Sequence, residues 1–150
     1  MKKGEILQKK GDFNTKVYQV QKGLLRSYIL DEKGKEHIYM FGPENWLVTD
    51  NCKPDEPCTL YIDAIEDTEL QLMSKSELLE TEPDLNRVLK RLNTMQARIL
   101  MLMSSSAKDR YEHFIHTYPD ITQRVPQRMI ASYLGITPEA LSRVRKESVR

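Results

Sequence analysis

The chain of 150 residues is long enough for one sizeable hydrophobic core, or for one ordinary domain with a small second one. Its hydrophobic share of 39% and charged share of 30% are ordinary for a globular protein in water, and its most apolar run, "RILMLM", is far shorter than the roughly 18 apolar residues that span a membrane. No apolar segment follows the basic start, so we expect neither a secretory signal nor a membrane partner, and a cytoplasmic chain with reduced cysteines.

Charge is distributed unevenly along the chain, although the formal net charge is only +1. Residues 44–82 hold eleven Asp or Glu against two Lys, a net of −9, whereas residues 121–150 hold five Arg and one Lys against two Glu, a net of +4. Because a basic surface attracts polyanions, the C-terminal segment predicts a polyanionic partner, and the acidic segment is typical of a solvated face.

The first half of the chain has the pattern of short strands separated by turns. Tyr18 and Val20 alternate with polar neighbours, which predicts a strand with one buried face. The polar group "DEKGK" at 31–35 predicts a hairpin turn. With "GEILQKKGD" near the start, six or seven strands result, which favours an antiparallel β-roll or sandwich in an α+β fold. The later predicted strands are at 24–30, 37–41, 60–65 and 69–73.

A long helix is predicted to follow, because apolar residues recur at two heptad positions. Leu89, Leu100 and Met103 widen this apolar surface beyond one stripe, so we expect one face for the rest of the chain and another for a partner helix in a homodimer. The alternative is a helix that packs only on its own roll. The predicted dimer seam consists of Leu85, Val88, Leu92, Met95, Ile99 and Leu102.

The segment "IASYLGITPEALSRVRK" has the spacing of two helices joined by a tight turn. A helix-turn-helix needs a small residue where the helices cross, a glycine able to take a positive φ, and apolar residues on the inner face of the second helix. Ala131, Gly135, Leu141 and Val144 meet these needs. We therefore predict a DNA-binding helix-turn-helix; the alternative is a basic helical hairpin with no role in DNA binding.

If the apolar residues of the last helix point inward, its polar residues point outward, where they can reach base edges. Arginine can bind guanine through two hydrogen bonds, glutamate can accept from cytosine, and serine is permissive. The predicted base-reading residues are Glu139, Ser142, Arg143 and Lys146. The predicted phosphate contacts are Gln127, Arg128, Thr137, Arg145 and Arg150. A two-fold dimer would require double-stranded DNA with an inverted repeat.

The whole chain resembles the Crp/Fnr family of bacterial transcription regulators. The segments "KGEILQKKGD", "VYQVQKGLLRSYILDEKGKEHI" and "IASYLGITPEALSRVRK" together carry the resemblance. It implies an effector-like β-roll similar to the cyclic-nucleotide-binding domain, a double-stranded β-helix, at 1–80. A dimerisation helix at 81–106 and a helix-turn-helix DNA-binding domain at 107–150 complete the implied architecture, that of a homodimeric regulator.

Within this resemblance, Glu139 and Arg143 look like the family's base-reading glutamate and arginine. Pro138 departs from the pattern, because the family's best-known member has an arginine there, so we expect a different target sequence. The helix and strand that usually precede the "KGE" stretch do not appear, nor does the β-hairpin wing that usually follows the recognition helix. We therefore expect an N-terminally short, wingless member of the family.

The family's nucleotide-binding members hold the ribose through a Gly-Glu pair and the cyclic phosphate through an Arg-Ser or Arg-Thr pair. By register these pairs are here Val48 with Thr49 and Cys58 with Thr59. No arginine follows Arg26 until the long helix, so a phosphate would lack its charge partner. We expect no cyclic nucleotide bound in the usual way and leave the effector unidentified. The candidate effector-pocket residues are Trp46, Thr49, Asp50, Cys58, Thr59 and Tyr61.

The remaining chemistry-bearing residues favour neither a metal site nor an enzyme. Cys52 and Cys58 do not have zinc spacing, and the family's iron-sulfur clusters need four cysteines; a thiol switch is the alternative for this pair. His113 and His116 lack a third ligand, and His37 is the only histidine in a predicted strand, which excludes a cupin-like metal site. We expect no metal, no cofactor and no catalysis. The rival function is a ligand- or protein-binding regulatory module whose helical tail does not bind DNA.

Overall fold

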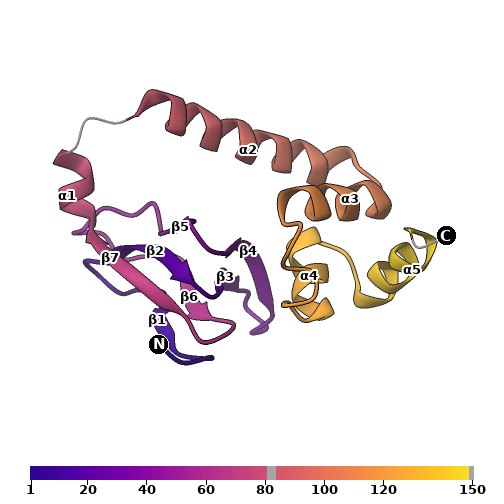
Figure 1. The fold of residues 1–150 in the computed structure, drawn as a ribbon, viewed down its shortest axis with the longest axis horizontal. Helices are drawn as coiled ribbons and strands as arrows, with labels where there is room; N and C mark the ends of the chain where they lie inside the picture. Colours follow the sequence, from indigo (N-terminus) through magenta and orange to yellow (C-terminus); the bar gives the residue numbers. More distant parts are fainter. Residues whose placement is uncertain (81–83, 149–150) are drawn as a thin grey trace. The chain divides into compact units, whose positions relative to one another are not determined.

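A computed structural model describes residues 1–80 and 84–148 of the chain. Internal contacts divide the chain into two compact units, Met1–Glu82 and Pro83–Arg150, which are described one after the other. All described strands belong to the first unit, and the described part of the second unit contains helices, turns and loops (Figure 1).

The first unit is a β-roll whose seven described strands form two antiparallel sheets. One sheet has the order β1-β6-β3-β4 and the other has the order β5-β2-β7, so spatial neighbours come from distant parts of the sequence. This roll, together with the helices of the chain, confirms the predicted α+β fold class. The strands are β1 (Ile6–Gln8), β2 (Lys16–Lys22), β3 (Leu25–Leu30), β4 (Glu36–Gly42), β5 (Leu47–Val48), β6 (Tyr61–Ala64) and β7 (Glu69–Ser74), and the short helix α1 (Lys75–Glu80) follows them.

β3 and β4 form the predicted hairpin, and Asp31 closes its turn. The Oδ1 atom of Asp31 accepts hydrogen bonds from the backbone N–H groups of Lys33 and Lys35, both at 2.9 Å. Because an aspartate at the start of a turn can satisfy these donors itself, the polar "DEKGK" group reverses the chain without help from elsewhere in the fold. β3 also pairs with β6, so the hairpin provides two of the four strands of the larger sheet.

Alternate residues of the strands build the hydrophobic core between the two sheets. Tyr18 and Val20 of β2, predicted to share a buried face, are 4% and 1% exposed. Burial of one large aliphatic side chain is worth about 1.5–3 kcal/mol relative to leaving it in water, so this core is a principal source of the unit's stability. The other core residues packed with Tyr18 and Val20 are Leu25, Met40, Val48, Ile62 and Ala64.

The four-stranded sheet also carries a buried ion cluster centred on Arg26, which alternates along β3 with the core residue Leu25. The guanidinium donates to both carboxylate oxygens of Asp63, at 2.7 and 2.9 Å, and to both of Glu36. It lies 4.3 Å from the centre of the Tyr28 ring. Burial, together with the negative charge of Asp63, raises the pKa of Tyr28 to about 12, so its hydroxyl stays protonated.

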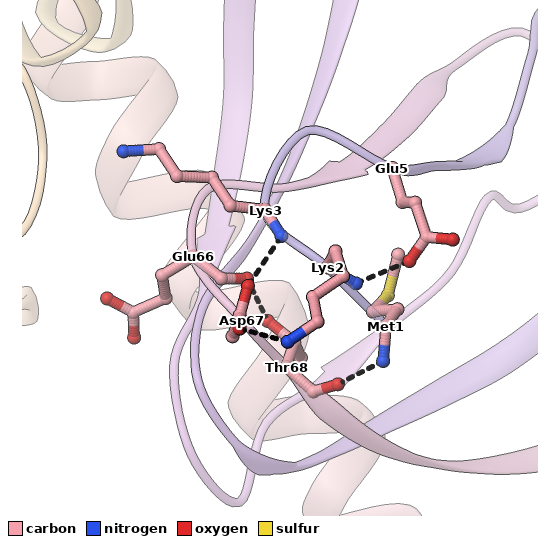
Figure 2. A network of polar contacts seen from close by, with 7 residues as sticks. All are labelled: Met1, Lys2, Lys3, Glu5, Glu66, Asp67 and Thr68. Atoms are coloured by element: carbon pink, nitrogen blue, oxygen red, sulfur yellow. Dashed lines mark hydrogen bonds and ion pairs between the residues drawn. The ribbon is translucent and has the colours of Figure 1, made fainter.

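A polar network joins the first residues of the chain to the turn between β6 and β7 (Figure 2). The amino group of Met1 donates to the carbonyl of Thr68 at 2.8 Å. Asp67 accepts from the ammonium of Lys2 and from the backbone N–H of Lys3, both at 2.9 Å. The side chains of Lys2 and Asp67 are 83% and 62% exposed, so water screens this ion pair far more than it screens the buried cluster.

The second unit contains four described helices: α2 (Leu85–Ser104), α3 (Ala107–Thr117), α4 (Gln127–Leu134) and α5 (Pro138–Ser148). α2 ends at Ser104, and reciprocal hydrogen bonds between Ser106 and Asp109 form a capping box that begins α3. Three rings from α3, its C-cap and α4 pack with their centres 5.4–5.6 Å apart, and they form the middle of a core. No helix in the described part of the chain is long and apolar enough to cross a membrane. The three aromatic rings in the middle of this core belong to Phe114, Tyr118 and Tyr133.

A tight turn centred on Gly135 joins α4 to α5. Gly135 has a φ of 64° and a ψ of 33°, and its N–H donates to carbonyls in the last turn of α4. A side chain is strained in this left-handed region, so glycine is the residue that fits. Two residues later, the hydroxyl of Thr137 accepts from the N–H of Ala140 at 3.2 Å and caps α5, which begins at Pro138.

Replacing Arg26 with Met should lower the free energy of unfolding by about 3–5 kcal/mol, because the buried carboxylate of Asp63 would lose its partner. Guanidinium chloride unfolding followed by circular dichroism measures the loss. Lys2→Met is the matched control, since it removes an exposed partner of Asp67 and should leave the unfolding midpoint almost unchanged. Equal losses in the two variants would show that burial adds nothing to the Arg26 cluster.

Replacing Gly135 with Ala should lower the free energy of unfolding by about 1–2 kcal/mol, through strain in the left-handed region. A steric clash is not the cause of this loss. A Cβ added at Gly135 would lie 3.5 Å from the nearest atom of Arg110 and 3.7 Å from that of Leu102, which are ordinary van der Waals distances. Gly135→Asn should lose less stability, since asparagine tolerates this backbone conformation. Thermal unfolding compares the two variants, and an Asn variant as unstable as the Ala variant would contradict the explanation by strain.

Candidate nucleic-acid interface

The inner face of α5 is buried, as the spacing of its apolar residues predicts. Leu141 is 0% and Val144 is 6% exposed. On α4, which contacts α5, Ile130, Ala131 and Leu134 are exposed by 1% or less. Apolar side chains thus hold α5 from one side only, and the other side is left for solvent or a partner.

The outer face of α5 is polar and exposed. Glu139, Ser142, Arg143 and Lys146 are all exposed, and their spacing of three, one and three residues places them on one side of a helix. A hydrogen bond from its own backbone N–H, and a second one involving the hydroxyl of Thr137, hold the pKa of Glu139 below its usual value. This face therefore offers a carboxylate that is charged at neutral pH beside two basic side chains.

Four of the five predicted phosphate contacts lie among the described residues of α4, of α5 and of the turn between them. Gln127 and Arg128 are exposed in the first turn of α4, Thr137 is exposed at the cap of α5, and Arg145 is half-buried on α5. Backbone N–H groups and the helix dipole make the start of a helix favourable for an anion, so the first three positions suit phosphate. Arg150 lies outside the described residues.

Sequence reasoning did not identify Arg110 of α3, which joins three helices of the second unit. Its guanidinium donates to the carbonyls of Leu102 at 2.8 Å, Ser105 at 3.1 Å and Leu134 at 3.1 Å. The last carbonyls of a helix have no partner within the helix, so Arg110 satisfies groups at the ends of both α2 and α4. Because its partners are backbone oxygens, no residue pattern in the sequence distinguishes Arg110 from a solvated arginine.

A second arginine that sequence reasoning missed ties α2 to α4. The guanidinium carbon of Arg98 lies 3.9 Å from the centre of the Tyr133 ring, and Arg98 donates to the carbonyl of the same tyrosine at 3.3 Å. A cation over a tyrosine ring is attracted by the electrons of the ring face. With Arg110, this contact fixes α4 to the C-terminal half of α2.

The predicted dimer seam on α2 is apolar and largely exposed. Leu85, Leu92 and Ile99 are 67%, 56% and 56% exposed, and Val88 and Leu102 are exposed as well. Met95 is half-buried. The residues expected to widen this surface, Leu89, Leu100 and Met103, are also exposed. So many apolar side chains in water along one helix are typical of a surface that another element covers.

In the β-roll, Asp50 is committed to the backbone around it. It is 5% exposed, and its carboxylate accepts from the N–H groups of Cys52 at 3.1 Å, Thr59 at 2.7 Å and Leu60 at 2.7 Å, and from the hydroxyl of Thr59. Burial disfavours its charged form, but these hydrogen bonds outweigh burial and hold the pKa of Asp50 below its usual value. The group is therefore a buried anion with its hydrogen bonds already made.

Of the other candidate pocket residues, Thr59 and Thr49 hydrogen-bond to Asp50, whereas Trp46 and Tyr61 pack against other residues. Thr49 donates to the carbonyl of Lys16 at 3.2 Å, whereas Trp46 packs against the hydrophobic core. Tyr61 stacks on the Tyr28 ring at 5.3 Å. These side chains thus contact other parts of the roll. Among the residues that the structure describes, no group of three or more His, Cys, Asp or Glu could hold a metal ion.

Residues 1–81 match the family model of the cyclic nucleotide-binding domain, more than half of the chain. The transcriptional activator protein anr of Pseudomonas aeruginosa is 28% identical over 163 residues, which cover 96% of this chain and 67% of that protein. The fumarate and nitrate reduction regulatory protein of Escherichia coli is 26% identical over 166 residues, which cover 96% and 65%. The chain thus spans about two thirds of the length of these relatives.

Two solved structures share the fold. FixK2 from Bradyrhizobium japonicum has a TM-score of 0.78 at 24% identity, covering 97% of this chain and 80% of that one. A transcriptional regulator of the CRP/FNR family from Thermus thermophilus has a TM-score of 0.78 at 17% identity, covering 100% and 84%. The relatives in sequence are regulators, which confirms the expectation that the chain is not an enzyme. The family model, these relatives and the shared fold together show that the chain belongs to the Crp/Fnr family of transcription regulators.

Proposed function

We propose that the chain is a sequence-specific DNA-binding regulator that acts as a homodimer in the cytoplasm, with α5 as the helix that enters the major groove. The division of α5 into two faces supports this most directly: Leu141 and Val144 are buried, and the polar face from Glu139 to Lys146 is exposed. A groove-reading helix needs this division, because one side is held by its domain and the other must reach base edges.

The chemistry of the exposed face suits direct reading of bases. Arg143 can donate two hydrogen bonds to guanine O6 and N7, and the charged carboxylate of Glu139 can accept from cytosine N4. Ser142 lies between these two residues on the same face, and Lys146 extends the face by about one turn beyond Arg143. Pro138 has no donor to offer, so reading at the outer base pair is weaker than in relatives with an arginine at this position.

Phosphate contacts would set the position of α5 in the groove without adding sequence preference. Gln127, Arg128 and Thr137 are exposed at the starts of α4 and α5, and Arg145 is half-buried on the flank of α5. The net charge of +4 over residues 121–150 adds long-range attraction to the DNA polyanion. Arg150 belongs to the same proposal on sequence grounds alone.

The exposed apolar face of α2 supports the homodimer, because a second copy of the same face would remove it from water. A two-fold dimer presents two copies of α5 to successive major grooves, roughly 34 Å apart, and therefore requires an inverted repeat. In this proposal residues 1–80 act as an effector-like domain, 81–106 as the dimerisation helix and 107–150 as the DNA-binding domain.

We further infer that the roll does not hold a cyclic nucleotide in the family's usual way. At the two positions where the ribose partners would be, Val48 is buried in the core, and Thr49 donates to backbone carbonyls. At the phosphate positions, Cys58 donates to the carbonyl of Lys9, and the N–H and hydroxyl of Thr59 already bind a carboxylate. An incoming phosphate would meet the buried anion of Asp50 and no arginine.

Replacing Leu92 and Ile99 with Glu should separate the dimer into single chains, because each copy of the seam would bury two unpaired charges. Sedimentation equilibrium measures the mass. Glu112→Lys, a charge change on the exposed face of α3, serves as a control and should leave the mass unchanged. A native protein with the mass of one chain at micromolar concentration would contradict the homodimer.

Isothermal titration with cyclic AMP and cyclic GMP should give no binding heat at micromolar concentration, because the charge partner of the phosphate is missing. Thermal unfolding with and without each nucleotide checks the same point, since a ligand that binds only the folded chain must raise its midpoint. A clean one-site isotherm would overturn the structural interpretation of Cys58 and Thr59.

Replacing Arg143 with Ala should weaken binding to the selected DNA site by about 1–3 kcal/mol and relax the preference at one base pair. Arg128→Ala is the matched control: it should weaken all sequences alike and reduce the salt slope of binding by about one. Selection from a random DNA library defines the site, and fluorescence anisotropy at several salt concentrations measures the affinities.

Three outcomes of this experiment would contradict the proposal. A selected motif without an inverted repeat would mean that two copies of α5 do not bind together. Arg143→Ala behaving like Arg128→Ala would mean that α5 contacts phosphates only. No binding to any DNA at low salt would favour the rival function, a ligand- or protein-binding module.

A further inference from the structure

Within the β-roll, a buried lysine contacts a cysteine thiol. Lys75, the first residue of α1, is 7% exposed. Its ammonium donates to the hydroxyl of Thr15 at 2.7 Å, to the carbonyl of Cys52 at 2.8 Å and to the Sγ of Cys52 at 3.1 Å. Cys52 is half-buried, whereas Cys58 is buried, so Cys52 is the more exposed of the two cysteines.

The charge on Lys75 needs a negative partner, because an isolated buried ammonium is costly. None of the three acceptors above is a carboxylate, and only the Sγ of Cys52 can ionise. Asp50, the carboxylate joined to the same loop, accepts from the backbone N–H of Cys52 and not from Lys75. A cation beside a cysteine favours the thiolate, which is the nucleophilic form of the side chain.

Thr15 supports the same charge state. Its Oγ1 lies 3.5 Å from the Sγ of Cys52. Because this oxygen already accepts a hydrogen bond from Lys75, its own proton is available for the sulfur. The sulfur can then accept from both an ammonium and a hydroxyl, an arrangement that suits a thiolate better than a thiol, which has a proton of its own to donate.

The second cysteine provides an internal contrast. Cys58 is 2% exposed, and its Sγ donates to the carbonyl of Lys9 at 2.9 Å. Burial raises the pKa of Cys58, so this side chain stays a protonated thiol at neutral pH. The same roll therefore contains one half-buried cysteine whose sulfur lies beside a cation, and one buried cysteine whose sulfur acts as a donor.

We propose that Cys52 is a modification site: a thiolate, held by Lys75, that reacts with hydroperoxides. The thiolate attacks one peroxide oxygen, so an S–O bond forms as the O–O bond breaks. The sulfur loses two electrons and the peroxide gains them. The hydroxide that leaves takes a proton from solvent and becomes water, and Cys52 is left as a sulfenic acid. This reaction does not depend on whether α5 binds DNA.

The test exposes the full, reduced chain to hydrogen peroxide in the presence of dimedone, which traps sulfenic acids, and locates the adduct by peptide mass mapping. The adduct should form on Cys52 and not on Cys58. An unstructured peptide with the sequence around Cys52 lacks Lys75 and serves as the reference. The chain should react about tenfold faster than this peptide, the effect of a cation beside the sulfur. A rate equal to or below that of the peptide would overturn the proposal.

Variants separate the charge of Lys75 from its packing. Lys75→Met should bring the rate down to that of the peptide, whereas Lys75→Arg should keep a large part of the acceleration. Labelling of Cys58 monitors unfolding in each variant, because that sulfur is reached only when the roll opens. Should Lys75→Met unfold, the comparison of the native chain with the peptide decides the question. An unchanged rate in a folded Lys75→Met variant would also overturn the proposal.

Discussion

Which side chains of α5 face outward depends on Gly135, the residue in the left-handed conformation between α4 and α5. Gly135 sets the direction in which the chain leaves α4, and Thr137 sets the residue at which α5 begins. Successive residues of a helix are about 100° apart, so a start one residue later would rotate the whole pattern by that angle. Leu141 and Val144 would then leave the core, and polar neighbours would enter it. The turn and the cap thus determine which side chains of α5 face outward.

The features that the sequence predicts correctly are those that short segments encode by themselves. The hairpin turn at Asp31 and the inward side of α5 follow from local chemistry, because a turn residue or an apolar spacing acts within a few residues. The sheet order β1-β6-β3-β4 and the pairing of Arg26 with Asp63 depend on strands that are distant in sequence. The pairing of these strands is decided only when both sheets pack against one core. Arg110 shows the same limit, since it binds carbonyls that every residue has.

The acidic loop after β5 binds its neighbouring backbone N–H groups through one of its own carboxylates. A cluster of backbone N–H groups needs an anion, and here the Asp50 carboxylate supplies it from within the chain. The segment at Thr59 and Leu60 is therefore ordered without any bound molecule. The sequence shows that an arginine is missing here, but it does not show that the Asp50 carboxylate binds these donors. Such a roll is a stable scaffold before any effector is considered.

The three carbonyls bound by Arg110 join the end of α2 to the end of α4 through one side chain. A guanidinium is planar and holds its five N–H groups in fixed directions, so it resists bending in a way that a single hydrogen bond does not. The end of α4 held in this way comes directly before the Gly135 turn, so Arg110 also fixes the point from which the chain enters α5.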